Sequence, residues 1–219
     1  MVCDDGCVHP PRDLDELMSR ARALEGVALS ELMDVSGLAV RTKGKAGEAM
    51  ERALGATGVG ASLDFPELGV ELKTIPVEPD LKPRESTFVC AITLAHADRE
   101  EWEHSWVKRK LSRVLWMPIV HEASLRRVGR AVLWTPTVEQ TCILQADFEE
   151  ILGAIAIGGI EGVTAHMGRW LQLRPKAADS HARALALGPD DALIETVPRG
   201  FYLRSRFTGA ILRDPSATP

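Results

Sequence analysis

Three side chains, Asp64, Glu71 and Lys73, have types and a spacing suited to the hydrolysis of a phosphodiester. That reaction needs a divalent cation to neutralise the phosphate and a water molecule made nucleophilic. Mg²⁺ prefers oxygen ligands, usually one or two carboxylates together with waters and substrate phosphate, and Asp64 and Glu71 can supply the carboxylates. Lys73 can orient or help to deprotonate the attacking water and offset charge on the phosphate. The pattern therefore predicts metal-assisted cleavage of a phosphodiester.

A strand must hold two of these side chains on one face. The apolar residues Val70 and Leu72 alternate with Glu71 and Lys73, and this period of two predicts a strand with one buried face. Glu71 and Lys73 then project from the same face, about 6.6 Å apart along the strand. The alternative is that they form the solvated outer face of an edge strand. The acidic loop that carries Asp64 directly before the strand favours the catalytic interpretation.

The other elements follow from hydrophobic spacing. Helices are predicted over 13–25, from 30 to 33, over 47–54 and over 139–155. Strands are predicted from 69, and over 87–94, 114–120, 128–134 and 170–176. Three glycines among small residues predict a mobile loop over 55–62. This order of helices, strands, helix and strands indicates a mixed α/β or α+β protein.

Charge is unevenly distributed along the 219 residues. Residues 1–103 carry a net charge of −9 and residues 104–219 a net charge of +4, which together give the overall −5. Binding of nucleic acid depends on a local basic patch rather than on the total charge, so the acidic average does not exclude it. No apolar run is long enough for a membrane span and the acidic start lacks signal-peptide features, so we expect a cytoplasmic protein without membrane contact.

Four scattered cysteines are too few for a disulfide framework in a chain of this length. Cys3, Cys7 and His9 have the side-chain types of zinc ligands. Three ligands within seven residues lack the spaced second half of most structural zinc sites, and they lie near a chain end. We therefore expect no zinc site there.

The segment 64–77 closely resembles the catalytic segment of the MutH family of methyl-directed mismatch-repair endonucleases, a branch of the restriction-endonuclease-like superfamily. The resemblance continues in the same order through 85–90, 110–116, 127–129, 171–178 and 198–203. It implies a mixed α/β, restriction-endonuclease-like fold, with a central mixed sheet flanked by helices and two lobes around a DNA cleft. The expected organisation is a disordered segment over 1–12, one two-lobed endonuclease domain over 13–212 and a flexible tail over 213–219.

Position by position, the resemblance implies that Asp64 and Glu71 bind the metal and that Lys73 is the catalytic lysine. Glu51 matches an additional active-site glutamate, and Lys110 matches a further lysine implicated in catalysis. Considered without the resemblance, Glu51 is a solvated residue on the surface of a helix.

The resemblance also implies a set of DNA-binding residues: Lys43, Phe88, Arg174, Pro175, Lys176 and Tyr202. Lys43 lies in a loop that closes on the DNA, Phe88 wedges against bases, and Tyr202 lies beside the adenine whose methylation is sensed. The segment 174–176 contacts the recognition sequence, and Arg174 has the side chain to bind guanine O6 and N7 bidentately. The alternatives are that Phe88 is a core residue of a strand and that Tyr202 packs against the sheet. The basic residues over 108–113 and 126–127 more simply contact phosphates or water.

The implied activity is Mg²⁺-dependent nicking of the unmethylated strand, 5′ to the G, at hemimethylated 5′-GATC-3′ sites, with Mn²⁺ able to substitute for Mg²⁺. The implied partners are double-stranded DNA containing GATC, the activator MutL and, indirectly, MutS, and we expect a monomer. The alternatives are a type II restriction endonuclease for the same site and a non-catalytic DNA-binding module of the same fold. The chain departs from the family at its N-terminus, in an acidic loop before Lys108 and in its polar chain end.

Overall fold

The computed structural model describes residues 8–35, 44–60, 62–123, 125–164, 166–176, 181–188 and 192–219. Cys3, Cys7 and Lys43 lie outside these ranges. The chain divides into two compact units, each built from several stretches of sequence. Unit 1 comprises 1–85, 112–135 and 211–215, and unit 2 comprises 86–111, 136–210 and 216–219. Within the described ranges, no helix is long and apolar enough to cross a membrane.

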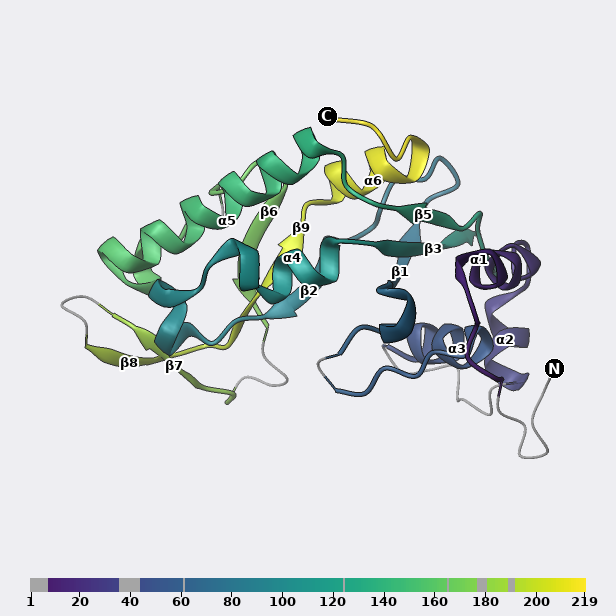
Figure 1. Ribbon diagram of the computed structural model, residues 1–219, viewed down its shortest axis with the longest axis horizontal. Helices are drawn as coiled ribbons and strands as arrows, with labels where there is room; N and C mark the ends of the chain where they lie inside the picture. The colour runs from purple at the N-terminus through teal and green to yellow at the C-terminus, as the bar shows by residue number, and fades with distance from the viewer. Residues whose placement is uncertain are drawn as a thin grey trace. The chain divides into compact units, whose positions relative to one another are not determined.

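Unit 1 combines helices with a mixed sheet (Figure 1). Its helices are α1 (Leu14–Ala23), α2 (Leu29–Val35) and α3 (Lys45–Leu54), followed by the 3-10 turn η1 (Pro66–Leu68). Its strands are β1 (Glu71–Val77), β3 (Val114–Glu122), β4 (Leu125–Val128) and β5 (Val132–Trp134). β1 pairs with β3 in parallel, whereas β4 and β5 both pair with β3 in antiparallel orientation. The expected mixed sheet is confirmed.

The core of unit 1 forms where apolar faces of the helices meet the sheet. Leu17 and Ala21 of α1 and Met50 of α3 are fully buried in one cluster with Leu115 and Met117 of β3. The helical spacing of these residues places them on one stripe of each helix, and burial of that stripe stabilises helices of this length. The helices predicted around 13–25, 30–33 and 47–54 are confirmed within a few residues at their ends.

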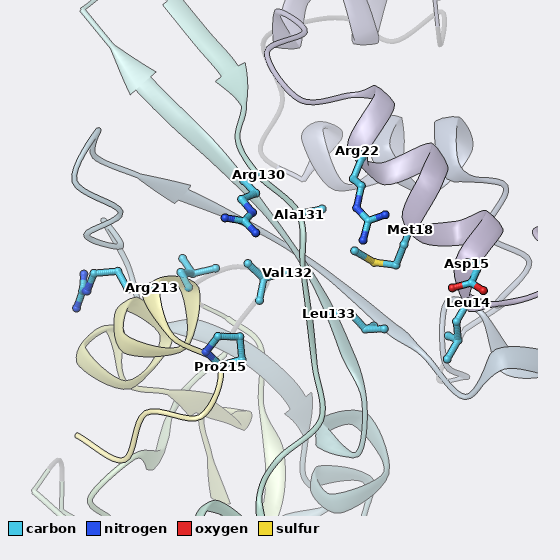
Figure 2. A pocket seen from close by; sticks show the side chains of 11 residues that line it. Leu14, Asp15, Met18, Arg22, Arg130, Ala131, Val132, Leu133, Arg213 and Pro215 are labelled. Carbon is cyan, nitrogen blue, oxygen red and sulfur yellow. The ribbon is translucent and has the colours of Figure 1, made fainter.

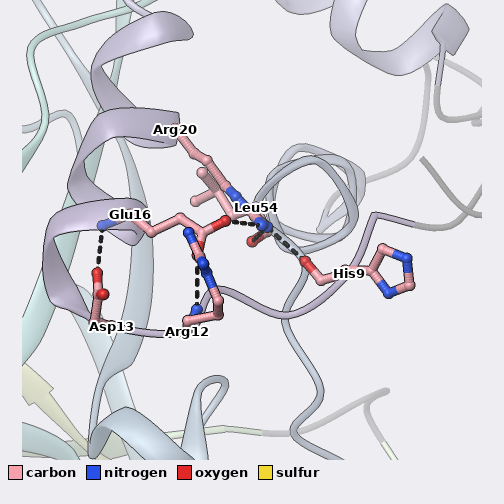
Figure 3. Close-up of polar contacts among 6 residues, drawn as sticks. All are labelled: His9, Arg12, Asp13, Glu16, Arg20 and Leu54. Atoms are coloured by element: carbon pink, nitrogen blue, oxygen red, sulfur yellow. Dashed lines mark hydrogen bonds and ion pairs between the residues drawn. The ribbon is translucent and has the colours of Figure 1, made fainter. Parts of the chain in front are cut away.

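Within the segment 1–12, for which disorder is expected, His9 and Arg12 form hydrogen bonds with side chains of α1 (Figure 3). Arg20 donates hydrogen bonds from Nη1 to the carbonyl oxygens of His9, at 2.5 Å, and Leu54, at 3.1 Å. Its Nη2 donates to Glu16, which also accepts from the backbone N–H and Nε of Arg12. The backbone hydrogen bond from Arg12, together with the two arginine side chains, lowers the pKa of Glu16 to about 2.

Unit 2 contains a second sheet. Its strands are β2 (Thr87–Ala91), β6 (Leu171–Pro175), β7 (Ala184–Leu187), β8 (Leu193–Thr196) and β9 (Arg199–Leu203). Its helical elements are η2 (Leu94–Arg99), η3 (Trp102–His104), α4 (Trp106–Leu111), α5 (Val138–Gly158), η4 (Ile160–Gly162) and most of α6 (Ser205–Arg213). β9 lies between β2 and β6 in an antiparallel sheet, and β7 pairs with β8 as a hairpin.

A buried carboxylate anchors the start of β6. Asp147 of α5 is 5% exposed and accepts hydrogen bonds from the backbone N–H groups of Arg169, Trp170 and Leu171, at 2.7 to 2.8 Å. Next to it, Phe148 packs against Phe201 of β9 with ring centroids 5.5 Å apart. α5 therefore anchors the start of the strand that carries Arg174.

Several sequence predictions need correction. The predicted strand over 128–134 is interrupted: β4 ends at Val128 and β5 begins at Val132, although both run antiparallel to β3, and between them the N–H of Gly129 donates to the carbonyl of Pro118. The predicted strand over 87–94 ends at Ala91, where η2 follows after two residues. The flexible tail over 213–219 stays a prediction; in the structure the carbonyl oxygens of Ala217 and Pro219 accept hydrogen bonds from Gln140 and Trp170.

Candidate active site

A tight turn brings Asp64 back to the beginning of β1. Phe65 and Val70 exchange backbone hydrogen bonds of 2.9 and 3.1 Å around η1, and Gly69 closes the turn with a φ of 62°. This left-handed conformation favours glycine, since a Cβ would be strained there. The turn allows Oδ2 of Asp64 to accept a hydrogen bond of 2.7 Å from the N–H of Leu72.

The glycine-rich loop over 55–62 holds the main chain of Asp64. The N–H groups of Thr57 and Gly58 both donate to the Asp64 carbonyl oxygen at 3.0 Å. A Cβ on Gly58 would lie 2.0 Å from the carbonyl oxygen of Leu63, which no side chain could tolerate. Glycine at this position is therefore required for the loop to approach Asp64 closely.

Glu71 and Lys73 form a close ion pair on β1. Oε1 of Glu71 lies 2.6 Å from Nζ of Lys73, and the two side chains are 2% and 14% exposed. The interpretation of these residues as a solvated outer face is therefore wrong. The prediction of one buried face is also wrong at this end of the strand, because Glu71 and Leu72 are both buried. The lysine makes this burial possible, since an unpaired carboxylate would be costly to remove from water.

Negative charge is concentrated around Asp64. Burial and the nearby charge of Glu71 raise the pKa of Asp64 to about 6, and the charge of Glu51 adds to the rise. The hydrogen bond from Leu72 and the charge of Lys73 act in the opposite direction. Carboxylates arranged in this way repel one another, and a cation bound between them would relieve the repulsion.

Glu51 faces this site from α3 and is half-buried, in contrast to the solvated surface position that its sequence context favours. Gly47 lies one turn earlier on α3, and a Cβ there would lie 3.8 Å from Oε1 of Glu51 and 3.5 Å from Oγ1 of Thr74 on β1. Both side-chain oxygens therefore lie within 4 Å of the same point, which places Glu51 close to β1.

The donor set fits a hard divalent cation. Asp64 and Glu71 offer carboxylate oxygens, the ligands that Mg²⁺ prefers, and Mg²⁺ usually takes its remaining ligands from water and phosphate. Within the described residues, no group of three or more His, Cys, Asp or Glu side chains is arranged to hold a metal ion. A metal ion bound by these two carboxylates would complete its coordination with water and substrate.

The structure places Glu51, Asp64, Glu71 and Lys73 together in unit 1. Lys110 lies near the end of α4 in unit 2, where it is half-buried.

A second group of predicted residues meets in unit 2. The rings of Phe88 and Tyr202, paired across β2 and β9, lie edge to face with centroids 5.3 Å apart. The guanidinium carbon of Arg174 lies 5.8 Å from the Tyr202 centroid, and Nζ of Lys176 lies 4.4 Å from the Phe88 centroid. We call Phe88, Arg174, Lys176 and Tyr202 the aromatic-basic cluster. Its cations lie within the distance at which they interact with aromatic faces, and the exposed Pro175 lies between them in the chain.

Neither ring of this cluster is a fully buried core residue. Phe88 and Tyr202 are both half-buried, so Phe88 is not the core residue that the alternative interpretation proposed, whereas Tyr202 does pack on the sheet through Phe88. Gly200, which sequence reasoning missed, makes room for this packing. A Cβ on Gly200 would lie 2.7 Å from Cε2 of Phe88 and 2.8 Å from the carbonyl oxygen of Cys90.

Several of the basic residues predicted to contact phosphate or water have protein partners, among them Arg127, whose Nη1 donates to the carbonyl of Gly26 at 2.8 Å. Arg113 donates from Nη1 to the carbonyl of Leu68 at 3.1 Å and so braces η1. Lys108 pairs with Glu103 of η3. These cations therefore stabilise local structure.

Two open cavities lie away from the predicted site residues. The one in unit 1, of about 540 Å³, is bounded by α1, β5 and the end of α6 (Figure 2). Arg22, Arg130 and Arg213 surround its apolar wall. The one in unit 2, of about 400 Å³, has Trp102 and Phe148 among its lining, with several glutamates. None of the predicted catalytic or DNA-binding residues lines either cavity.

Comparison with known proteins identifies close relatives. The family model described as the DNA mismatch repair enzyme MutH matches residues 56–147, which include Asp64, Glu71, Lys73 and Lys110. The chain is 44% identical over 213 residues to the DNA mismatch repair protein MutH of Serratia proteamaculans, covering 93% of each chain. It is 44% identical to that of Shewanella sp. ANA-3 over 94% of this chain and 96% of the relative. It is 45% identical to that of Shewanella amazonensis over 93% and 96%.

Proposed function

This chain belongs to the MutH family of DNA mismatch repair endonucleases and has the family's restriction-endonuclease-like fold, and on that basis we propose that it nicks the unmethylated strand at hemimethylated GATC sites, 5′ to the G. The enzyme is a nuclease whose substrate is DNA, and its family implies a divalent metal. We propose in addition which metal ion it uses, which sequence and methylation state it recognises, and which residues bind the metal, catalyse cleavage and contact the DNA.

The observation that carries the proposal is the placement of Asp64 next to the buried ion pair of Glu71 and Lys73 at the start of β1. Oδ2 of Asp64 is held by the N–H of Leu72, and Oε1 of Glu71 by Nζ of Lys73. We assign Asp64 and Glu71 as the ligands of Mg²⁺, with Mn²⁺ as a substitute. When bound, such an ion neutralises charge on the scissile phosphate and lowers the pKa of a bound water.

The remaining catalytic roles fall to residues near this pair. Lys73 orients the attacking water with its ammonium group, which lies at the carboxylate of Glu71. In its neutral form the same amine would accept the proton that the water loses. Glu51 adds negative charge beside Asp64 and so favours cation binding. On the family resemblance alone, Lys110 is assigned to supply a further positive charge to the phosphate and Lys43 to contact the DNA.

Recognition of the sequence is assigned to the aromatic-basic cluster. Arg174 donates two hydrogen bonds to O6 and N7 of a guanine in the major groove, Pro175 and Lys176 contact the neighbouring sequence, and Phe88 wedges against the bases. Tyr202 lies beside the adenine, where an added N6-methyl group would meet its ring. The contact of Phe88 with Tyr202 supports a common role for the two rings.

We further propose that the protein acts as a cytoplasmic monomer, that MutL activates it and that MutS recognises the mismatch upstream. The test is cleavage of one duplex containing a single GATC in unmethylated, hemimethylated and fully methylated forms. The proposal expects single-strand nicks in the first two and much slower cleavage of the third. Cleavage of both strands of the hemimethylated duplex would instead indicate a restriction enzyme, and binding without cleavage would indicate a non-catalytic module.

A further inference from the structure

Ser86 joins two strands of the unit 2 sheet through its hydroxyl group. Its Oγ accepts a hydrogen bond of 3.0 Å from Nε2 of Gln172 and one of 3.3 Å from Nη1 of Arg174. Ser86 immediately precedes β2, whereas Gln172 and Arg174 lie two residues apart on β6. Because side chains alternate along a strand, Gln172 and Arg174 project from the same face and can share one acceptor.

These contacts form a supported arrangement. Gln172 is 8% exposed, so its amide needs a partner inside the protein, and Ser86 is that partner. A hydroxyl oxygen has two lone pairs for acceptance, and the two donors occupy both. The buried Gln172 therefore holds the Ser86 oxygen in place, independently of the hydrogen bond that this oxygen accepts from the exposed side chain of Arg174.

Arg174 is thereby held from two sides. Its Nη1 is bonded to Ser86, and its guanidinium carbon lies 5.8 Å from the centroid of Tyr202, which is the register partner of Gln172 on β9. A guanidinium group is planar, and a bidentate contact to guanine requires that plane to face the base edge. A free arginine side chain would lose more conformational entropy in adopting that orientation.

From this geometry we infer that Ser86 and Gln172 are positioning residues that hold the Arg174 guanidinium in the orientation for guanine recognition. The inference rests on the proposed function, because it assumes that Arg174 recognises a guanine. It makes sequence preference depend on two residues that need not touch DNA themselves.

The test compares single-turnover nicking of a GATC duplex with nicking of the same duplex carrying 7-deazaguanine, which lacks the N7 acceptor. The wild-type protein should prefer guanine over 7-deazaguanine. Ser86→Ala should reduce that preference by about five-fold, the change that corresponds to one hydrogen bond of about 1 kcal/mol. Ser86→Thr, which keeps the hydroxyl, should retain it.

Two further variants separate positioning from general damage. Gln172→Met keeps the buried volume but removes the amide, and should also reduce the preference. Ser205→Ala changes another half-buried serine of unit 2 and should leave the preference as in the wild type. A double-mutant cycle completes the design: in an Arg174→Ala background, Ser86→Ala should cause no further loss of preference.

The results that would contradict the positioning role of Ser86 and Gln172 differ from those that would contradict the proposed function. If Arg174→Ala removes the guanine preference and folded Ser86→Ala and Gln172→Met leave it intact, the inference is wrong and the proposed function stands. If Ser86→Ala reduces preference equally with and without Arg174, its effect does not pass through Arg174, and the inference is also wrong. If the wild type shows no preference for GATC at all, the proposed function fails and takes the inference with it.

Discussion

The carboxylate of Glu71 and the ammonium of Lys73 lie 2.6 Å apart on β1, in a place where only 2% of the glutamate side chain is exposed. An ionised carboxylate at such a depth is stable only with a close cation and good hydrogen bonds. Lys73 therefore has a structural role in addition to the catalytic role proposed for it. Substitutions in this pair must keep a positive charge if they are to report on chemistry alone.

Lys73→Arg should separate these two roles. The arginine keeps a positive charge beside Glu71, but its proton is not available for transfer near neutral pH. We expect the single-turnover rate constant to fall by about 100-fold or more, the usual contribution of general acid-base catalysis, with DNA affinity nearly unchanged. Lys82→Arg on the surface of the same unit is the matched control. Weaker binding with an unchanged rate constant would reassign Lys73 to phosphate anchoring.

Asp64→Asn should stabilise the metal-free protein above pH 6. The folded-state pKa of Asp64 is raised to about 6, so the folded state binds more protons than the unfolded state between the ordinary aspartate pKa and that value. The contribution of Asp64 to the free energy of unfolding therefore falls as pH rises from about 4 to about 6. We expect the variant to exceed the wild type by about 1 to 3 kcal/mol at pH 7 and to match it near pH 4.

Urea denaturation with a chelator present measures this difference, and Glu67→Gln, which changes an exposed carboxyl of the same turn, is the control. Added Mg²⁺ should raise the unfolding free energy of the wild type at pH 7 and have little effect on Asp64→Asn. If the variant is less stable than the wild type at pH 7 without metal, the ionised Asp64 carboxylate does not destabilise the folded protein, and the prediction is wrong.

The sequence was sufficient to predict the local elements around the site. The alternation from Val70 to Lys73 predicted β1, and the acidic loop before it correctly placed Asp64 beside Glu71. The burial of Glu71 could not be predicted, because an alternating pattern assigns charged residues to the outer face and does not reveal an ion pair made within one strand. Glu51 required the family resemblance, since its helix presents a carboxylate like many on solvated surfaces.

Unit 2 was less predictable for physical reasons. β7 and β8 are four residues each, too short for a clear period, and they pair only with each other. In β9, the side chains of Phe201 and Leu203 are buried. The strand begins with Arg199 and Gly200, however, and these two residues weaken the alternating pattern that would predict it. The contacts of Asp147 join residues more than twenty positions apart, and no local spacing indicates such a long-range hydrogen bond.

Gly200→Ala should disturb the aromatic-basic cluster. The added Cβ would lie 2.7 Å from the Phe88 ring and 2.8 Å from the Cys90 carbonyl, so the ring and the strand must move apart. We expect a loss of about 1 to 3 kcal/mol in unfolding free energy and slower nicking of GATC duplexes. Gly153→Ala is the control, because a Cβ there meets no atom within 4 Å. Wild-type stability and activity in Gly200→Ala would show that the position of the Phe88 ring affects neither the unfolding free energy nor the nicking rate.

Tyr202→Ala should narrow the rate difference between hemimethylated and fully methylated duplexes, whereas Tyr202→Phe should preserve it. Methylation of adenine N6 adds bulk and removes one donor hydrogen in the major groove, and the ring, held by Phe88, would resist that bulk. Circular dichroism and thermal unfolding establish that each variant is folded. An unaltered ratio in folded Tyr202→Ala would leave Tyr202 as a packing residue and assign methyl sensing to another part of the protein.

The most direct test of the central claim is the nicking of a supercoiled plasmid that contains GATC, by wild-type protein and by Asp64→Asn and Glu71→Gln, each with Mg²⁺ and with a chelator. If Asp64 and Glu71 hold the metal at the start of β1, the wild type converts the plasmid to nicked circles only with Mg²⁺, and both folded variants leave it supercoiled while still binding DNA. Nicking at the wild-type rate by either variant would contradict this assignment.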